Sequence, residues 1–112
     1  MNDCLFCKIA AGEIPSTCLY NDDDVYAFRD INPQMPVHFL VIPKQHIKSA
    51  AAVDETNSAI VAHCFEVIAK VAKEKGMDSF RVVSNIGEQA GQSVFHLHFH
   101  VLSGRDMTWP PG

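Results

Sequence analysis

Three of the chain's six histidines lie at alternate positions near its C-terminal end, as His96, His98 and His100. Successive side chains of a β-strand point to opposite faces, so this spacing places all three imidazoles on one face. The opposite face then carries the intervening apolar residues Phe95, Leu97, Phe99 and Val101. A helix would mix the two classes, so the pattern predicts a strand over residues 95–102 with its apolar face in the core.

Three interpretations of this row of histidines are open. The simplest is a solvated strand face, although such a face normally carries Thr, Lys, Glu or Ser. Neutral imidazoles are also common zinc ligands, and alternate strand positions can converge on one ion. Alternatively, an imidazole nitrogen can attack phosphorus or an acyl carbon and form an intermediate that water then cleaves. In that case a neighbouring imidazole can bind the phosphate oxygens.

The segment Gly87–Ser93 leads directly into the histidine strand and is small and polar. Glycines let a backbone approach an anion closely, so that N–H groups can point at phosphate oxygens. The serine hydroxyl could face a leaving group. An ordinary hairpin loop would have the same composition, but its position beside three histidines makes it a candidate phosphate-binding loop.

The remaining pattern predicts an α+β protein with an antiparallel sheet. Apolar residues recur at three- and four-residue spacing between Ile60 and Ala72, which indicates one long helix. Asp54 suits its N-cap and Gly76 its C-terminal cap. We expect this helix to cover one sheet face. The predicted strands are residues 18–20, 25–28, 37–42, 80–85 and 95–102.

Length and composition narrow the function classes. A chain of 112 residues with 47% apolar and 20% charged residues suits one domain over residues 1–112. Its net charge of −4 argues against nucleic-acid binding, which usually needs a basic surface. No stretch has the length of a membrane span, and no signal peptide is evident, so we expect a cytoplasmic protein without membrane partners.

The four cysteines are therefore expected to be reduced rather than paired in disulfides. Cys18 and Cys64 have no partner pattern and are interpreted as packing residues, and Asp22–Asp24 as a solvated turn. Cys4 and Cys7 form a C-x-x-C pair, which could be packing residues, metal ligands or redox thiols.

The segment His96–Leu102 resembles the His-x-His-x-His-apolar-apolar motif of the histidine triad (HIT) superfamily. The resemblance extends over nearly the whole chain and points to the histidine triad nucleotide-binding (Hint) branch. The segments that carry it are Phe28–Pro33, His38–His46, Gly91–Val94 and Gly104–Gly112. It implies a HIT-like fold with a five-stranded antiparallel sheet and one long helix, and a homodimer in which the two sheets join across the interface.

The resemblance also implies a function. Members of this branch bind purine nucleoside monophosphates and hydrolyse the phosphorus–nitrogen bond of nucleoside phosphoramidates, through a nucleotidyl-histidine intermediate and with no cofactor required for the chemistry. We therefore expect an AMP- or GMP-amine phosphoramidase. Two alternatives remain: a dinucleoside polyphosphate hydrolase, and a nucleotide-binding interaction protein with incidental catalysis.

Residue roles follow from the resemblance position by position. His98 would be the nucleophile, and His100 would bind phosphate oxygens. His96 and His38 would line up behind His98 and set its protonation, and Ser93 would assist the leaving amine. Asn85, Gly91 and Gln92 would contact the phosphate region, and Asp30 would accept hydrogen bonds from the ribose hydroxyls. The walls of the purine pocket would be Leu5, Phe6, Ile14, Phe28 and Ile31. Trp109 would reach toward the partner subunit's site. Without the resemblance, most of these would be interpreted as core or turn residues.

The C-x-x-C pair has a counterpart in other HIT proteins, where it holds a structural zinc together with two histidines. The resemblance implies that the matching set here is Cys4, Cys7, His46 and His96. Such a set forms a closed tetrahedral site. If zinc binds His96, that imidazole cannot also act as an acid or base. The competing interpretation is a pair of reduced cysteines at an apolar N-terminal turn.

Overall fold

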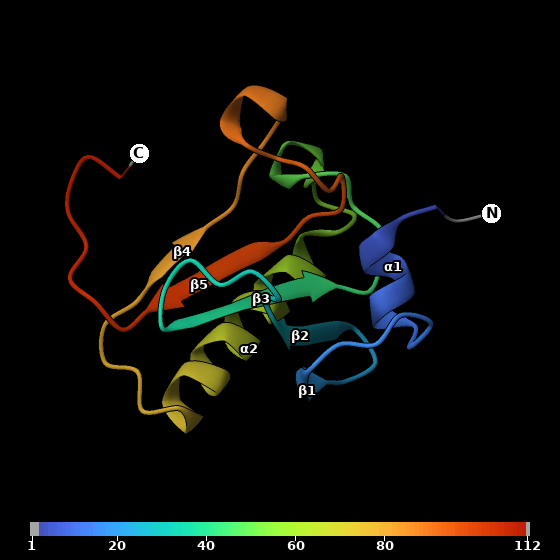
Figure 1. Ribbon diagram of the computed structural model, residues 1–112. Coiled ribbons are helices and arrows are strands. Elements are labelled where there is room, and N and C mark those ends of the chain that lie inside the picture. The colour runs from blue at the N-terminus through green and yellow to red at the C-terminus, as the bar shows by residue number, and fades with distance from the viewer. Residues whose placement is uncertain (1–2, 112) are drawn as a thin grey trace.

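The computed structural model describes residues 3–111, and a five-stranded antiparallel sheet forms its centre (Figure 1). The strand order is β1-β2-β3-β5-β4, so β1 and β4 are the two edges. The strands are β1 (Cys18–Asn21), β2 (Val25–Arg29), β3 (Val37–Pro43), β4 (Arg81–Val83) and β5 (Phe99–Ser103). This confirms the predicted α+β class, sheet and long helix.

The long helix α2 (Ser58–Glu74) packs on one face of the sheet (Figure 1). Its buried residues, among them Val67 and Val71, meet alternate residues of β2, β3 and β5. The predicted N-cap was wrong, because the helix begins after Asn57. The Asp54 carboxylate instead accepts hydrogen bonds from the backbone N–H and hydroxyl of Thr56, which form a separate turn.

The opposite sheet face is covered by a short helix that the sequence analysis did not expect, α1 (Leu5–Ala10). Phe6 and Ile9 are buried against side chains of β2 and β3 on this face. The residues they meet are Tyr26, Phe28, Leu40 and Ile42. The expected long helix thus covers one face, and α1 in addition covers part of the histidine face. Two short 3-10 helices, η1 (Ala50–Ala52) and η2 (Glu88–Ala90), complete the elements.

The histidine strand is shorter than predicted, although its alternation is correct. Leu97, Phe99 and Val101 are buried on the α2 face. The β3–β5 ladder, however, begins only at the Val41–Phe99 pair, although β3 continues to Pro43. The Leu97 N–H donates instead to the carbonyl of Ile47, beyond the end of β3. Residues 95–98 therefore lead into β5 outside the ladder, and Phe95 is partly exposed rather than in the core.

The prediction for Cys18 was wrong: Cys18 is exposed, whereas Cys64 is buried as predicted. The turn between β1 and β2 is exposed at Asp23 and Asp24, as expected, but Asp22 is partly buried. It accepts hydrogen bonds from the backbone N–H groups of Asp24 and Val25 and lies 2.6 Å from His63 Nε2 on α2. The hairpin is thereby fastened to the helix.

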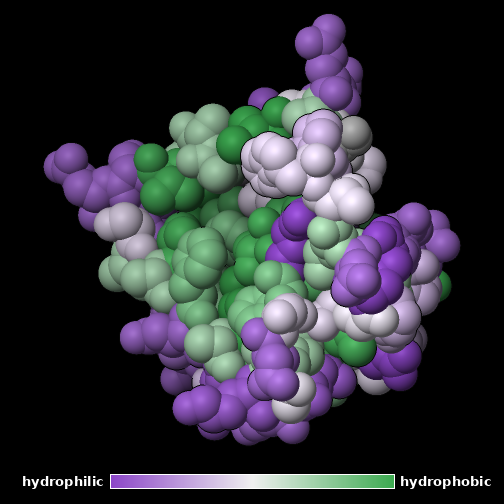
Figure 2. Space-filling model, turned by 90° about the vertical axis from the view of Figure 1, so that its left-hand side faces the viewer, coloured by the Kyte–Doolittle hydropathy of each residue, from purple (hydrophilic) through white to green (hydrophobic). Residues whose placement is uncertain are grey.

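The surface around the β4 edge is notably apolar. Figure 2 shows a broad hydrophobic area on the side of the molecule that carries β4 and the C-terminal segment in Figure 1. Phe80, which precedes β4, is partly exposed. No helix within residues 3–111 is both long enough and apolar enough to cross a membrane.

Candidate active site and metal centre

Four histidines gather on the sheet face that α1 covers. His38 comes from β3, His100 from β5, and His96 and His98 from the segment that leads into β5. His96 is completely buried, and His38 and His98 are each 6% exposed. The ring of Phe6 on α1 meets the His98 ring edge to face, with centroids 4.9 Å apart. From the sequence alone, this row of histidines could have been exposed to solvent. In the fold it is enclosed between the sheet and α1.

The hydrogen bond at His98 fixes the tautomer of its ring. His98 Nδ1 lies 2.7 Å from the carbonyl oxygen of His96. A carbonyl only accepts hydrogen bonds, so Nδ1 must carry the proton, and in the neutral ring Nε2 keeps its lone pair. Burial lowers the pKa of His98, which favours this neutral form. The middle histidine therefore has the protonation state that a nitrogen nucleophile requires.

A second chain of hydrogen bonds fixes His100. The backbone N–H of Gln34 donates to His38 Nδ1 at 3.0 Å, so the proton of neutral His38 lies on Nε2. That nitrogen is 2.9 Å from His100 Nδ1 and 3.3 Å from Asp30 Oδ2. His100 Nδ1 consequently accepts, and its own proton lies on Nε2. We call Asp30, His38 and His100 the relay cluster.

The pKa shifts agree with this assignment. Burial, followed by the proximity of His98 and His38, lowers the pKa of His100 to about 4. Burial also lowers the pKa of His38, against the opposing effect of Asp30. Both rings are therefore neutral near pH 7. The site thus offers two complementary nitrogens side by side: a lone pair on His98 and an N–H donor on His100.

A cavity of about 360 Å³ opens between α1 and these histidines. This volume lies in the range of small-molecule sites. Its lining includes eleven residues predicted to bind substrate: Leu5, Phe6, Ile14, Phe28, Asp30, Ile31, Asn85, Gly91, Ser93, His98 and His100. The sequence analysis missed Ile9, Pro15, Ser16, Leu40 and Val94. Two of these had a usable signal, because Leu40 alternates with His38 on β3 and Ile9 follows Leu5 by one helical turn.

Gln92, which was predicted to contact the substrate, does not line the cavity. Gln92 is 4% exposed, and its side-chain amide donates to the carbonyls of Lys48 and Val94 and accepts from the Gly87 N–H. It therefore shapes the loop instead of lining the cavity. Trp109 is 81% exposed and does not line the cavity.

The candidate phosphate-binding loop has more internal hydrogen bonds than expected. The N–H groups of Ala90, Gly91 and Gln92 all donate to carbonyls within the loop. They cannot form the predicted cradle while these bonds persist. Gly91 has φ +97°, a conformation that favours glycine, and its position brings it against the Asn85 side chain. The loop reaches the cavity through Gly91 and Ser93.

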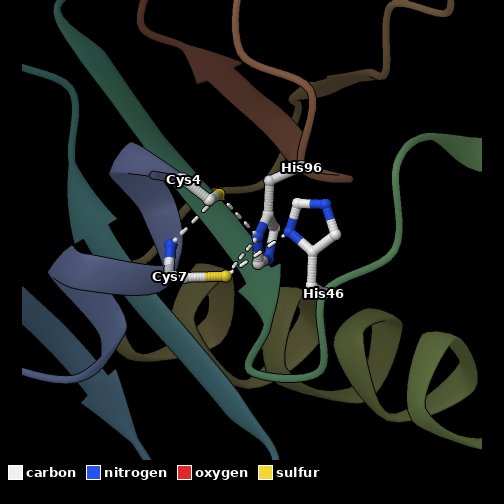
Figure 3. Close-up of side chains that lie close together, drawn as sticks. All are labelled: Cys4, Cys7, His46 and His96. Atoms are coloured by element: carbon white, nitrogen blue, oxygen red, sulfur yellow. Dashed lines mark hydrogen bonds between the residues drawn. The ribbon is translucent and has the colours of Figure 1, made fainter. Parts of the chain in front are cut away.

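The second site is the one predicted for zinc. Cys4 caps the N-terminus of α1 and Cys7 lies within it, while His46 follows β3 and His96 precedes β5 (Figure 3). Their four ligand atoms lie within 4.8 Å of one another and point to a common centre. We call these four residues the metal cluster.

Its distances fit a tetrahedral zinc ion. Each cysteine sulfur lies 3.3 Å from His96 Nδ1, and Cys7 Sγ lies 3.4 Å from His46 Nδ1. Zinc–sulfur and zinc–nitrogen bonds of ordinary length place neighbouring ligands about 3.5 Å apart in a tetrahedron. His96 Nε2 lies 2.7 Å from the Pro43 carbonyl oxygen, so it carries the proton and leaves the Nδ1 lone pair for the metal. Burial lowers the pKa of His96 to about 4, which keeps the ring in its neutral form.

Comparisons with known proteins show the family to which this chain belongs. The family described as "Scavenger mRNA decapping enzyme C-term binding" matches residues 3–109. A 14 kDa zinc-binding protein of Zea mays is 48% identical over 96% of this chain and 87% of its own length. An uncharacterized HIT-like protein of Synechocystis is 45% identical over 98% of this chain and 97% of its own.

Solved structures give the same result. The HIT family hydrolase of Legionella pneumophila is 46% identical, covers 98% of this chain and all of its own, and superposes with a TM-score of 0.95. The chain belongs to the histidine triad superfamily and has the fold of a HIT family hydrolase.

Proposed function

We propose that this protein is a purine nucleoside phosphoramidase of the Hint branch, which hydrolyses the P–N bond of AMP- and GMP-amine conjugates. The observation that carries the proposal is the pair of complementary nitrogens at the cavity, the His98 Nε2 lone pair and the His100 N–H donor. The apolar walls from α1, β2 and β3 suit a flat purine ring. Asp30 offers a carboxylate to the ribose hydroxyls.

In this mechanism His98 Nε2 attacks phosphorus while the P–N bond to the amine breaks. The Nδ1–H bond to the His96 carbonyl stabilises the positive charge that the imidazole acquires. His100 donates its Nε2–H to a non-bridging phosphate oxygen. The departing nitrogen must gain a proton. Ser93 lies in the cavity wall, where its hydroxyl can donate one to the nitrogen and take one in turn from a solvent water molecule.

Water completes the reaction. It attacks the phosphorus of the nucleotidyl-His98 intermediate and releases a proton to solvent as the P–N bond to His98 breaks. The nucleoside monophosphate then leaves with the lone pair restored on Nε2. Zinc has a structural role in this proposal, held by the metal cluster away from the reacting atoms. The reduced thiolates that it needs agree with a cytoplasmic location.

We also propose that the protein acts as a homodimer, joined through the β4 edges of two sheets. Support comes from the open edge of β4 and from the hydrophobic area on that side of the molecule (Figure 2). An unpaired strand edge beside an apolar surface readily pairs with another chain. Trp109, exposed on the single chain, would then be available to the partner's cavity.

Hydrolysis of a fluorogenic adenosine phosphoramidate tests the enzymatic proposal. We expect turnover by the native protein and a loss of at least about a thousandfold in His98→Ala. AMP binding should persist in that variant. Native protein that binds AMP without turnover would disprove the phosphoramidase and leave a nucleotide-binding protein. Faster cleavage of a dinucleoside polyphosphate than of the phosphoramidate would instead identify an anhydride hydrolase.

A further inference from the structure

The backbone around the nucleophile is held by contacts outside the sheet ladder. The β4–β5 pairing ends at the Val83–His100 pair, and β5 itself begins at Phe99. His98 therefore lies just beyond the last paired residues of both neighbours. In this segment the Leu97 N–H donates to the Ile47 carbonyl, and His96 Nε2 donates to the Pro43 carbonyl.

A further bond comes from a side chain with no other assigned role. Ser84 directly follows β4, and its hydroxyl donates to the carbonyl oxygen of His98 at 2.9 Å. The register places Ser84 one step past the Val83–His100 pair, so this bond continues the strand pairing where the ladder stops. The next residue, Asn85, lines the cavity.

We propose that Ser84 is a positioning residue for the nucleophile, an inference that rests on the proposed function of His98. The Ser84 hydroxyl fixes the peptide plane that follows His98, while the His96 carbonyl fixes the ring through Nδ1. These two hydrogen bonds together keep the His98 ring in one orientation, with Nε2 directed into the cavity. Without the Ser84 bond, the backbone at residue 98 gains freedom and the ring leaves the attacking geometry more often.

A matched control exists at the other end of the same strand pair. Ser103, the last residue of β5, donates its hydroxyl to the Ser79 carbonyl at 2.7 Å. Both bonds join a serine hydroxyl to a carbonyl across the β4–β5 pair. Replacing either serine with alanine removes one hydrogen bond of the same kind, but only Ser84 contacts the nucleophile residue. A general weakening of the sheet would affect both variants alike.

The first measurement does not depend on turnover. Nitrogen NMR of the native protein should show one His98 tautomer with a hydrogen-bonded Nδ1–H. Ser84→Ala should weaken or broaden that signal, and Ser103→Ala should leave it unchanged. An unchanged signal in Ser84→Ala overturns the proposal, whatever reaction the enzyme catalyses.

The second measurement is steady-state hydrolysis of the adenosine phosphoramidate. We expect Ser84→Ala to lower kcat about tenfold with KM changed less than twofold, because alignment and not binding is lost. Ser84→Thr, which keeps the hydroxyl, should restore most of the rate. Native-like kcat in Ser84→Ala, or an equal loss in Ser103→Ala, would refute the positioning role. Absence of turnover in the native protein would contradict the proposed phosphoramidase and leave the NMR result to decide on Ser84.

Discussion

The metal cluster and the relay cluster lie on the same sheet face. The first brings two imidazoles and two cysteine sulfurs within 4.8 Å of one another, and the second brings two imidazoles and a carboxylate within the same distance. By distance alone, both could hold a cation. They differ in the backbone group that contacts one ring nitrogen of His96 and of His38. At His96 that contact is a carbonyl oxygen, from Pro43, whereas at His38 it is an N–H group, from Gln34.

This difference assigns the two clusters to different chemistry. The carbonyl holds the proton of His96 on Nε2, so Nδ1 is left as a metal ligand. The Gln34 N–H requires a lone pair on His38 Nδ1, so the proton must lie on Nε2, the nitrogen that faces Asp30 and His100. A metal ion on His38 Nε2 would force a proton onto Nδ1, opposite another donor. The backbone partner of a histidine, more than its side-chain neighbours, decides whether it binds a metal or passes on a hydrogen bond.

The largest effect should come from removing a zinc ligand. We expect the native protein to hold about one zinc per chain and Cys7→Ala to hold none. The free energy of unfolding should fall by about 4 kcal/mol, the value for a ligand at a thousand times its dissociation constant. Elemental analysis and chemical denaturation measure the two quantities.

The exposed Cys18 provides the control for that experiment. Cys18→Ala should keep both the zinc and the stability. A native protein that holds two zinc ions, with the second one lost in Asp30→Asn, would show that the relay cluster also binds metal. That result would overturn the distinction between the clusters.

The face on which the histidines lie can be predicted from the sequence. Their hydrogen-bond partners cannot, for a physical reason. The period of two in residues 96–101 is sufficient to separate the histidine face from the apolar face. The tautomers, by contrast, depend on Gln34 and Pro43 backbone groups that are brought to the rings only by folding. Gln92 shows the same limit, because a sequence cannot tell whether an amide points at a ligand or at its own loop.

The starts of the two helices were not predicted correctly, and the reasons are local. Helix α1 has six residues, too few for a clear period, and its start depends on Cys4 Sγ accepting the Cys7 N–H at 3.4 Å. Asp54 has the right residue type for an N-cap, but its carboxylate is used by the preceding turn. Such competition between nearby acceptors is not visible in residue type alone.

A change in the relay cluster should give a smaller effect that leaves the metal untouched. His38→Leu removes the donor to His100 Nδ1, so His100 can place its proton on either nitrogen and loses its fixed donor into the cavity. We expect kcat for the phosphoramidate to fall about a hundredfold with the zinc content unchanged. His38→Gln, whose amide can both accept from Gln34 and donate to His100, should recover part of the rate. Loss of zinc in His38→Leu would show that the clusters are not separate.

The smallest effect tests how far the clusters are independent. Helix α1 carries two zinc ligands and also the cavity residues Leu5 and Phe6. His96 is a third zinc ligand, and its backbone carbonyl accepts the hydrogen bond from His98 Nδ1–H. AMP should therefore tighten zinc binding about fivefold, and zinc should tighten AMP binding by the same factor, because such coupling is reciprocal. Chelator competition with and without AMP measures the first factor, and calorimetry of the zinc-loaded and zinc-free protein measures the second.

Two fragments of the nucleotide distinguish the routes of this coupling. In the proposed binding mode adenosine would contact the apolar walls, so it should retain most of the effect if α1 transmits it. Inorganic phosphate would contact only the histidines, so it should retain most of the effect if the bond between His96 and His98 transmits it. Equal zinc affinity with and without AMP would mean that α1 is rigid in the absence of metal. In that case the metal cluster stabilises the fold without preparing the cavity, and the two clusters differ in function as completely as they differ in their backbone partners.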